Sequence, residues 1–236
     1  QCGAKVYITS RDAEACNDAA LELSAAGPGS CIALPHDLIR EAGVLDFVAE
    51  LGEVESSLDI LVNNSGSSWG APMDKYPEAA FDKVFALNVT SPFLLTRGCL
   101  PLLRAAASAE DPSRVINIGS IAGLMPQPVP TFAYDASKAA IHHLTRKLST
   151  ELAPHHITVN AIAPGFVPSK MSSQLLTYAK AEAIQSAIPL NRWGSQEDMG
   201  GTAVYLASRA GAWTSGQVLA VDGGSVAQPV KMVDDE

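Results

Sequence analysis

Tyr134 and Lys138 are the residues of this chain whose types and spacing most readily suggest chemistry, because they lie four positions apart. The residues that follow them favour helix, and on a helix side chains at i and i+4 lie on one face. A free tyrosine titrates near pH ~10, and a neighbouring positive charge favours the phenolate and lowers that pKa. Such a pair could pass a proton to or from an alcohol or carbonyl oxygen. Taken alone, the spacing also fits two surface residues of an amphipathic helix.

The elements that would position this pair alternate along the chain. Apolar runs typical of strands occur at residues 5–10, 31–34, 58–64, 114–118, 157–162 and 217–221. Helical patterns fall at residues 12–26, 40–54, 78–103, 134–152, 172–188 and 196–207, the third with a bend expected near Pro92 and Pro101. Strands that are apolar along their length and alternate with helices indicate a parallel sheet covered on both faces. We therefore predict one α/β domain, spanning residues 1–236, with a doubly wound parallel sheet.

Polar or glycine-bearing residues follow five of the predicted strands. In open parallel sheets, ligands bind outside the carboxyl ends of the strands. Five such ends on one edge predict a lined cleft. The residues concerned are Ser10 and Arg11, His36 and Asp37, Asn63 to Gly66, Gly119 and Ser120, and Pro164 to Val167.

Two of these positions, Arg11 and Asp37, have both a functional and a local interpretation. In a dinucleotide-binding fold an arginine at the position of Arg11 would accommodate a 2′-phosphate, although it could also be a plain exposed side chain. Asp12 could cap the following helix. Asp37 could hydrogen-bond an adenine amino group or simply begin a turn.

The other strand ends and one helix carry further candidates. Gly66 would allow the backbone to approach a ligand closely, and the amide of Asn64 could bind ribose or brace neighbouring strands. Ser120 could hydrogen-bond a substrate oxygen or be only a turn residue. Asn88 falls within a predicted helix, where an amide usually faces solvent or bonds the backbone; functionally, it could loosen the helix and hold a water molecule beside Lys138.

Composition limits the classes of partner. The chain has 236 residues, 47% of them apolar, and a formal net charge of −9, which argues against nucleic acid and anionic membranes as partners. No apolar run is long enough to span a membrane, and no signal peptide is evident. The four widely spaced cysteines indicate a reducing, cytoplasmic compartment. Adjacent histidines do not share a helix face, so we expect no metal site.

With these residues assembled, the chain resembles the short-chain dehydrogenase/reductase family along nearly its whole length. The resemblance implies a Rossmann-type fold and an oxidoreductase that uses NADP(H), with NADPH preferred over NADH. The matching residues are Asn63-Asn64-Ser65-Gly66, Asn88, Ser120, Tyr134 with Lys138, Pro164-Gly165 and Val221-Asp222-Gly223-Gly224.

The same resemblance implies roles for individual residues. Tyr134 would be the general acid/base, Ser120 would orient the substrate carbonyl, and Asn88 would hold a water of the proton relay. Lys138 would lower the pKa of Tyr134 and bind the nicotinamide ribose. The remaining cofactor contacts would come from Ser10, Arg11, Asp37, Asn64, Gly66, Pro164, Gly165, Val167 and Ser169, of which Val167 would meet the nicotinamide carboxamide through its backbone.

Substrate and assembly are also implied by resemblance. Residues 134–144 and 164–171 resemble the family branch of the rhamnolipid-pathway 3-oxoacyl reductases, which suggests a small-molecule 3-oxoacyl or similar carbonyl substrate. The segment 172–188 should cover that substrate, and its Leu175, Leu176, Tyr178 and Ile184 fit either an apolar pocket wall or ordinary packing. The resemblance further implies a homotetramer.

One family element is missing from the sequence. The family opens with a strand and a Thr-Gly-x-x-x-Gly-x-Gly turn whose following helix holds the cofactor diphosphate. Here Gln1-Cys2-Gly3-Ala4 resembles the end of that helix and runs directly into the next strand. We therefore expect a first strand–helix unit to be missing from the chain, which leaves unpaired edges in the middle of the sheet. The alternative is a truncated, catalytically inactive relative that acts as a binding or assembly partner.

Overall fold

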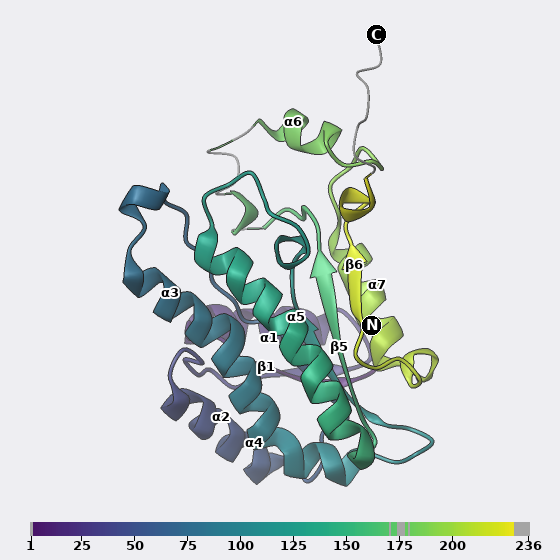
Figure 1. Cartoon of the computed structure of the whole chain (residues 1–236). Coiled ribbons are helices and arrows are strands. Elements are labelled where there is room, and N and C mark those ends of the chain that lie inside the picture. The colour runs from purple at the N-terminus through teal and green to yellow at the C-terminus, as the bar shows by residue number, and fades with distance from the viewer. Residues whose placement is uncertain (1, 170, 174–177, 179, 229–236) are drawn as a thin grey trace.

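The computed structural model describes residues 2–169, 171–173, 178 and 180–228, which form strands alternating with helices (Figure 1). The strands are β1 (Lys5–Ile8), β2 (Ser30–Ala33), β3 (Ile60–Asn63), β4 (Ser113–Ile118), β5 (Ile157–Pro164) and β6 (Val218–Val221). The helices are α1 (Ala13–Ala25), α2 (Glu41–Val54), α3 (Glu78–Phe85), α4 (Ser91–Ala106), α5 (Phe132–Leu152), α6 (Ala181–Ser186) and α7 (Gln196–Ala207). This alternation confirms the predicted α/β class.

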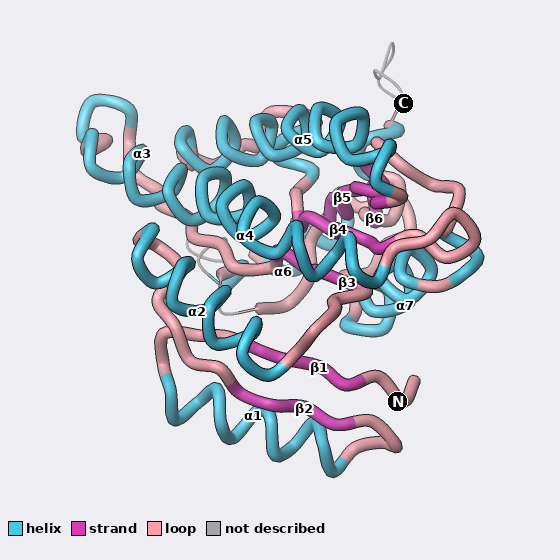
Figure 2. Tube along the Cα trace, turned by 90° about the horizontal axis from the view of Figure 1, so that it is seen from below, coloured by secondary structure: helices cyan, strands magenta, loops and turns pink. Residues whose placement is uncertain are grey.

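Every strand pairing in the described chain is parallel. Strand β1 pairs with β2, and a separate four-stranded sheet has the order β3-β4-β5-β6. In Figure 2 the two sheets lie one after the other, with β1 and β3 as the facing edge strands. Neither edge strand has a second pairing partner among the described residues. Val6 on β1 is 42% exposed and Val62 on β3 is 45% exposed, whereas the strands of a parallel sheet are normally buried on both faces.

Helices cover both faces of the four-stranded sheet. Helices α4 and α5 pack against β3, β4 and β5, while α7 packs against β4, β5 and β6 on the other side (Figures 1 and 2). The core beneath α4 and α5 is large and extends to α2 through Val44, Phe47 and Leu51. The core beneath α7 is much smaller and contains only Ile116, Ile162 and Leu206 as fully buried apolar residues of the described chain.

Local capping explains several helix starts. Asp12 accepts a hydrogen bond from the backbone N–H of Ala15, so the capping interpretation of Asp12 is confirmed. Helix α7 begins with a capping box in which Ser195 and Asp198 bond each other's backbone N–H groups. Its bounds are those predicted from the sequence.

Two predicted helices differ in the structure. The helix expected at 78–103 is divided by a π-helical turn, η2 (Ala86–Thr90), in which the side chain of Asn88 bonds residues outside the helix. The helix expected at 172–188 is shorter: α6 covers only Ala181–Ser186, and Ser172 and Ser173 belong to a turn of their own. Residues 174–177 and 179 lie outside the described residues.

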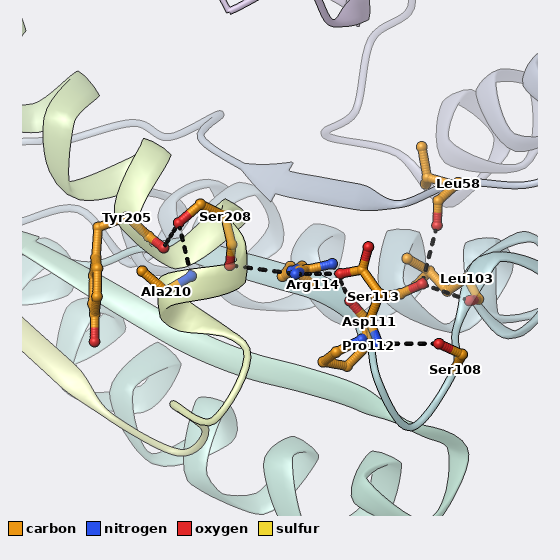
Figure 3. A network of polar contacts seen from close by, with 10 residues as sticks. All are labelled: Leu58, Leu103, Ser108, Asp111, Pro112, Ser113, Arg114, Tyr205, Ser208 and Ala210. Atoms are coloured by element: carbon orange, nitrogen blue, oxygen red, sulfur yellow. Dashed lines mark hydrogen bonds and ion pairs between the residues drawn. The ribbon is translucent and has the colours of Figure 1, made fainter.

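A buried arginine fixes the end of β4 that is remote from the predicted cleft (Figure 3). The guanidinium of Arg114, 5% exposed, pairs with Asp111 at 2.7 Å and donates to the carbonyl groups of Pro112 and Ser208. Ser208 follows the last residue of α7 and caps the next turn through Ala210. Arg114 thereby fastens α7 to the central strand of the sheet.

Candidate active site

Lys138 lies at the centre of the site, on α5 where this helix passes the carboxyl end of β4. Its side chain is 5% exposed, and Nζ donates a 2.7 Å hydrogen bond to the carbonyl of Ile118, the last residue of β4. Nζ is 5.5 Å from the centre of the Tyr134 ring. Burial lowers the pKa of Lys138 to about 8, because the charged form is poorly solvated there.

Tyr134 shares this face of α5, as the spacing predicted, but its pKa moves in the direction opposite to the expectation. Burial raises the pKa of the Tyr134 phenol, hydrogen bonding with the Ser120 side chain works to lower it, and Asp135 adds to the rise. The pKa of Tyr134 is raised although Nζ of Lys138 lies 5.5 Å from the centre of its ring. Tyr134 therefore remains a protonated phenol, which is a proton donor, at neutral pH.

The π-helical turn places Asn88 in the interior of the site. Asn88 is 2% exposed, and its amide oxygen accepts from the backbone N–H of Ser67 at 2.8 Å. Its amide nitrogen donates to the Ser67 carbonyl and to the hydroxyl of Ser137, both at 2.9 Å. Ser137 precedes Lys138 on α5, so Asn88 ties the loop after β3 to the helix that carries Tyr134 and Lys138. π-Helical turns are frequently found at functional sites.

Gly66 lies between two of these residues. A Cβ atom at position 66 would lie 3.3 Å from Oδ1 of Asn88 and 3.8 Å from Nζ of Lys138. The glycine therefore keeps the approach to both polar groups open, as predicted from the sequence. Asn64 is exposed beside it, with its backbone N–H bonded to the carbonyl of Val62.

Ser120 directs the turn that follows β4. Its hydroxyl accepts from the backbone N–H of Ala122 at 3.1 Å and so caps the short helix η3 (Ile121–Gly123). That helix packs tightly on α5: a Cβ at Gly123 would lie 2.5 Å from the backbone of Lys138. Asn88, Ser120, Tyr134 and Lys138, which are distant in sequence, thus surround one region at the carboxyl ends of β3 and β4.

The residues predicted to bind the adenosine end lie after β1 and β2. Arg11 is exposed and has no ion-pair partner among residues of known placement. Ser10 accepts from the backbone N–H of Asp12, and Asp37 accepts from that of Ile39 at 3.2 Å. Asp37 therefore forms a local turn, while its second carboxylate oxygen and the exposed Arg11 can meet a ligand.

The loop after β5 carries the residues predicted for the nicotinamide end. Pro164 ends the strand, and Gly165 lies so close to Asp222 that a Cβ would be 2.7 Å from its Cα. Val167 has no backbone hydrogen bond to any described residue. Ser169 instead exchanges hydrogen bonds with Ser172 and caps a turn.

These residues fit the two ends of a dinucleotide. Arg11 suits a ribose phosphate, and Lys138 with the open backbone at Gly66 suits a ribose next to the reacting ring. Buried oxygen atoms without a hydrogen-bond partner in the described structure also occur at the strand ends, in Thr9 and Ser67. The turn from β1 to α1 contains no glycine, so the described chain offers no glycine-rich turn for a diphosphate.

Sequence reasoning did not single out Ser137 or His142. Ser137 is the α5 anchor of Asn88, and His142, 2% exposed, contacts the turn at Ser120. Their positions at i−1 and i+4 from Lys138 are the only sequence signal for either. Of the predicted pocket wall, Ile184 is buried and Tyr178 is 50% exposed, while Leu175 and Leu176 lie outside the described residues.

The part of the chain that the structure places contains no candidate metal site and no candidate membrane-spanning helix. No group of three or more His, Cys, Asp and Glu side chains among those residues could hold a metal ion. No helix formed by them combines the length and apolar character needed to cross a bilayer.

Comparison with known proteins agrees with this geometry. Residues 1–226 match a family model described as enoyl-(acyl carrier protein) reductase. The rhamnolipids biosynthesis 3-oxoacyl-[acyl-carrier-protein] reductase of Pseudomonas aeruginosa is 50% identical over 225 residues, which cover 95% of this chain and 87% of that protein.

Solved structures give the same result. The NADP active-site complex of Pseudomonas aeruginosa RhlG superimposes with a TM-score of 0.89 at 49% identity, covering 94% of this chain and 86% of that one. A putative NAD(P)-dependent gluconate 5-dehydrogenase from Beutenbergia cavernae gives a TM-score of 0.87 at 34% identity, with coverage of 96% and 88%. The chain belongs to the short-chain dehydrogenase/reductase family.

Proposed function

We propose that this protein is an NADP(H)-dependent oxidoreductase that reduces a carbonyl group, of a 3-oxoacyl compound or a similar ketone, to a secondary alcohol. One observation carries the proposal: a partly buried phenol that stays protonated, Tyr134, and a buried amine, Lys138, are held on one face of α5 beside Ser120 and Asn88. This is the arrangement needed to protonate an oxygen as hydride reaches the adjacent carbon.

The residues would divide the work as follows. Bound NADPH supplies the hydride. The Ser120 hydroxyl orients the substrate carbonyl, and Tyr134 donates its proton to the developing alkoxide. Lys138 binds the nicotinamide ribose, and Asn88, anchored to Ser67 and Ser137, supports a water that returns a proton to the site. The backbone of Val167 holds the nicotinamide carboxamide.

The substrate class rests on the relatives and on the apolar surroundings of the site. The Pseudomonas relative is named for 3-oxoacyl reduction, whereas the Beutenbergia structure is named for gluconate. Trp69 and Tyr178 are both partly exposed, and a Cβ at the intervening Gly70 would lie 3.0 Å from the Tyr178 hydroxyl. We propose that these aromatic side chains border the substrate, where they would favour an acyl chain over a sugar acid.

A substrate panel tests the proposal. Initial rates with 3-oxoacyl thioesters, sugars and cyclic ketones should be compared under NADPH and NADH. We expect the highest kcat/KM for a 3-oxoacyl thioester with NADPH. A preference for sugars would refute the substrate class. Absence of NADPH binding in a direct titration would instead favour an inactive binding or assembly partner.

Arg11 should determine the preference between the two nicotinamide cofactors. Replacing Arg11 by Asp removes a charge-assisted contact to the 2′-phosphate and adds repulsion, so the Kd for NADPH should rise about ten- to a hundredfold. The Kd for NADH should change little. Fluorescence titration measures both values, with Arg104→Gln as an exposed arginine control on α4. An equal loss for both cofactors would contradict the assigned role.

We further propose that one more parallel strand, followed by a glycine-rich turn and a helix, completes the sheet between β1 and β3. The support is the pair of facing strands that have no second partner among the described residues, each with an exposed valine, at Val6 and Val62. The core between α7 and the four-stranded sheet is small, as expected if a further helix is needed to cover that face of the sheet. Buried strand edges need partners for their N–H and C=O groups. The turn would add the diphosphate contacts that the described chain lacks.

Adding such a unit should strengthen cofactor binding. A fusion that places the first strand, turn and helix of the Pseudomonas relative before residue 2 should bind NADPH at least about tenfold more tightly than the chain alone, since a helix N-terminus with backbone donors binds phosphate. Hydrogen exchange at β1 and β3 should slow at the same time. A fusion with its turn glycines replaced by valine is the control. Unchanged exchange would contradict the placement of the strand.

We also propose a cytoplasmic, single-domain protein that forms a homotetramer. The four cysteines are free, as in a reducing compartment. The exposed apolar side chains of the described surface include Phe81, Phe93 and Phe132 on α3 to α5 and Val204 and Tyr205 on α7. Two separate surfaces of this kind suit an assembly with two types of interface. Light scattering coupled to size-exclusion chromatography measures the mass.

A further inference from the structure

His142 is a buried ionisable residue that the proposed mechanism does not use. It lies on α5 one turn beyond Lys138 and is 2% exposed. Tyr134, Lys138 and His142 follow at intervals of four residues, so they form one stripe along the helix. The neighbouring His143 is exposed. The stripe therefore continues the catalytic face of α5 with a third polar group.

The imidazole of His142 contacts the turn that carries Ser120. Its Nε2 atom accepts a long hydrogen bond, 3.4 Å, from the backbone N–H of Ser120. The ring also lies directly against Gly119, where a Cβ would be 2.1 Å from Nε2 and 2.7 Å from Cδ2. Any other residue at position 119 would displace the ring, so the glycine and the histidine form a matched pair.

The hydrogen bond defines the form of the imidazole. Because Ser120 N–H is a donor, Nε2 must carry a lone pair, and the proton of the neutral ring resides on Nδ1. Burial lowers the pKa of His142 to about 4, the charges of Lys138 and Arg146 act in the same direction, and the Gly123 backbone works against them. His142 is therefore a neutral acceptor at physiological pH.

Two successive turns of α5 thus form hydrogen bonds on both sides of Gly119, the residue that links β4 to the turn carrying Ser120. Lys138 donates to the carbonyl of Ile118, and His142 accepts from the N–H of Ser120. The backbone of Gly119 between them is itself bonded to Ile162 on β5. With both groups held, the backbone of Ser120 has little freedom to rotate. Its hydroxyl accepts from the backbone N–H of Ala122 and also interacts with the Tyr134 phenol.

We propose that His142 is a positioning residue that sets the orientation of the Ser120 hydroxyl relative to Tyr134. The effect of His142 on turnover rests on the proposed function, whereas the contact between His142 and Ser120 exists without substrate or cofactor. It predicts that loss of the imidazole acceptor weakens the influence of Ser120 on the Tyr134 phenol. A histidine that only fills space would leave this influence unchanged when replaced by an apolar residue of similar size.

The first test needs no activity. Tyrosines labelled with ¹³C at Cζ report the pKa of Tyr134, assigned with Tyr134→Phe, in the cofactor-free protein. His142→Leu should raise this pKa in the same direction as Ser120→Ala, and the double variant should show no further rise. His143→Leu should leave it unchanged. His142→Gln, whose side-chain oxygen can accept from the same N–H, should restore most of the original value.

The second test uses turnover. His142→Leu should lower kcat between about ten- and a hundredfold, with a smaller change in KM, since small misplacements of a catalytic group have effects of this size. His142→Gln should recover most of kcat. If the Tyr134 pKa is identical in the wild type and in a folded His142→Leu protein, the positioning role is refuted. If no variant, nor the wild type, reduces any carbonyl while the pKa results hold, the proposed function fails and the positioning role stands.

Discussion

Tyr134→Phe should lower the rate of NADPH-dependent carbonyl reduction by at least about a hundredfold, because a positioned general acid contributes about 10²- to 10⁴-fold. The substitution removes one oxygen atom and keeps the ring that packs beside Lys138. NADPH affinity should therefore change less than about threefold, and the free energy of unfolding by no more than about 1.5 kcal/mol, the net value of one hydrogen bond. Stopped-flow or steady-state absorbance of NADPH gives the rate.

The matched control is Tyr205→Phe. Tyr205 lies on α7 and bonds Thr214 at 3.1 Å, away from the Tyr134 site, so this variant should keep near-normal turnover. Retention of normal turnover by Tyr134→Phe would overturn the mechanism. The raised pKa of Tyr134 also predicts how the two directions of the reaction depend on pH. The phenol stays protonated up to and beyond its ordinary value near 10, which suits reduction, whereas alcohol oxidation would need the phenolate and should rise with pH.

Lys138→Met should abolish at least about 99% of activity, since a buried positioning charge of this kind is worth several kcal/mol in a closed site, yet it should not destabilise the fold. Lys138 is 5% exposed, and burial alone lowers its pKa to about 8. Methionine has similar length and no charge to desolvate. We expect a free energy of unfolding at pH 7 that equals the wild-type value or exceeds it by up to about 2 kcal/mol, after the loss of the Ile118 hydrogen bond.

The pH dependence of the free energy of unfolding distinguishes the desolvation of Lys138 from a general repacking of the core. The pKa of Lys138 is about 8 in the folded protein and about 10.5 when unfolded. Below pH 8 the lysine is charged in both states, and its desolvation cost is fully present. Between pH 8 and 10.5 the unfolded state binds more protons, so the wild type should gain about 3 kcal/mol relative to Lys138→Met as pH rises.

Urea unfolding at pH 7, 8.5 and 10 measures this gain. Lys147→Met is the control, because Lys147 lies on the same helix with a largely exposed side chain that pairs with Glu151, and it should show no such window. A Lys138→Met protein whose stability runs parallel to that of the wild type at all three pH values would contradict the desolvation argument.

The sequence predicted those features that depend on local pattern. Helical spacing was sufficient to place Tyr134 and Lys138 on one face, and the class of fold followed from alternating apolar runs. The residues alone left a functional and a local interpretation open for both Ser120 and Asn88, and the family resemblance favoured the functional one. The contacts that define them join β3, η2, β4 and α5.

Other features were beyond local reasoning because they depend on long-range packing. Helix α3 ends at Phe85, before the π-helical turn in which Asn88 bonds Ser67 and Ser137, and no helical periodicity reveals these partners. The direction of the Tyr134 pKa depends on burial, which only the packed structure gives. His142 has the spacing of a core residue, and its polar role appears only when Ser120 is placed against it.

The π-helical turn at Ala86–Thr90 has a consequence for how the chain tolerates change in length. A π turn contains one residue more than the α-helical turn it replaces, so it shifts everything after it by about 100° around the helix axis. Leu95, Cys99 and Leu103 of α4 face the core only in this phase. Removing one residue here would restore a regular helix and turn these three side chains away from the sheet. The side chain at position 88 can therefore be substituted without shifting α4, whereas the number of residues in the segment 86–90 is fixed by the core packing of α4.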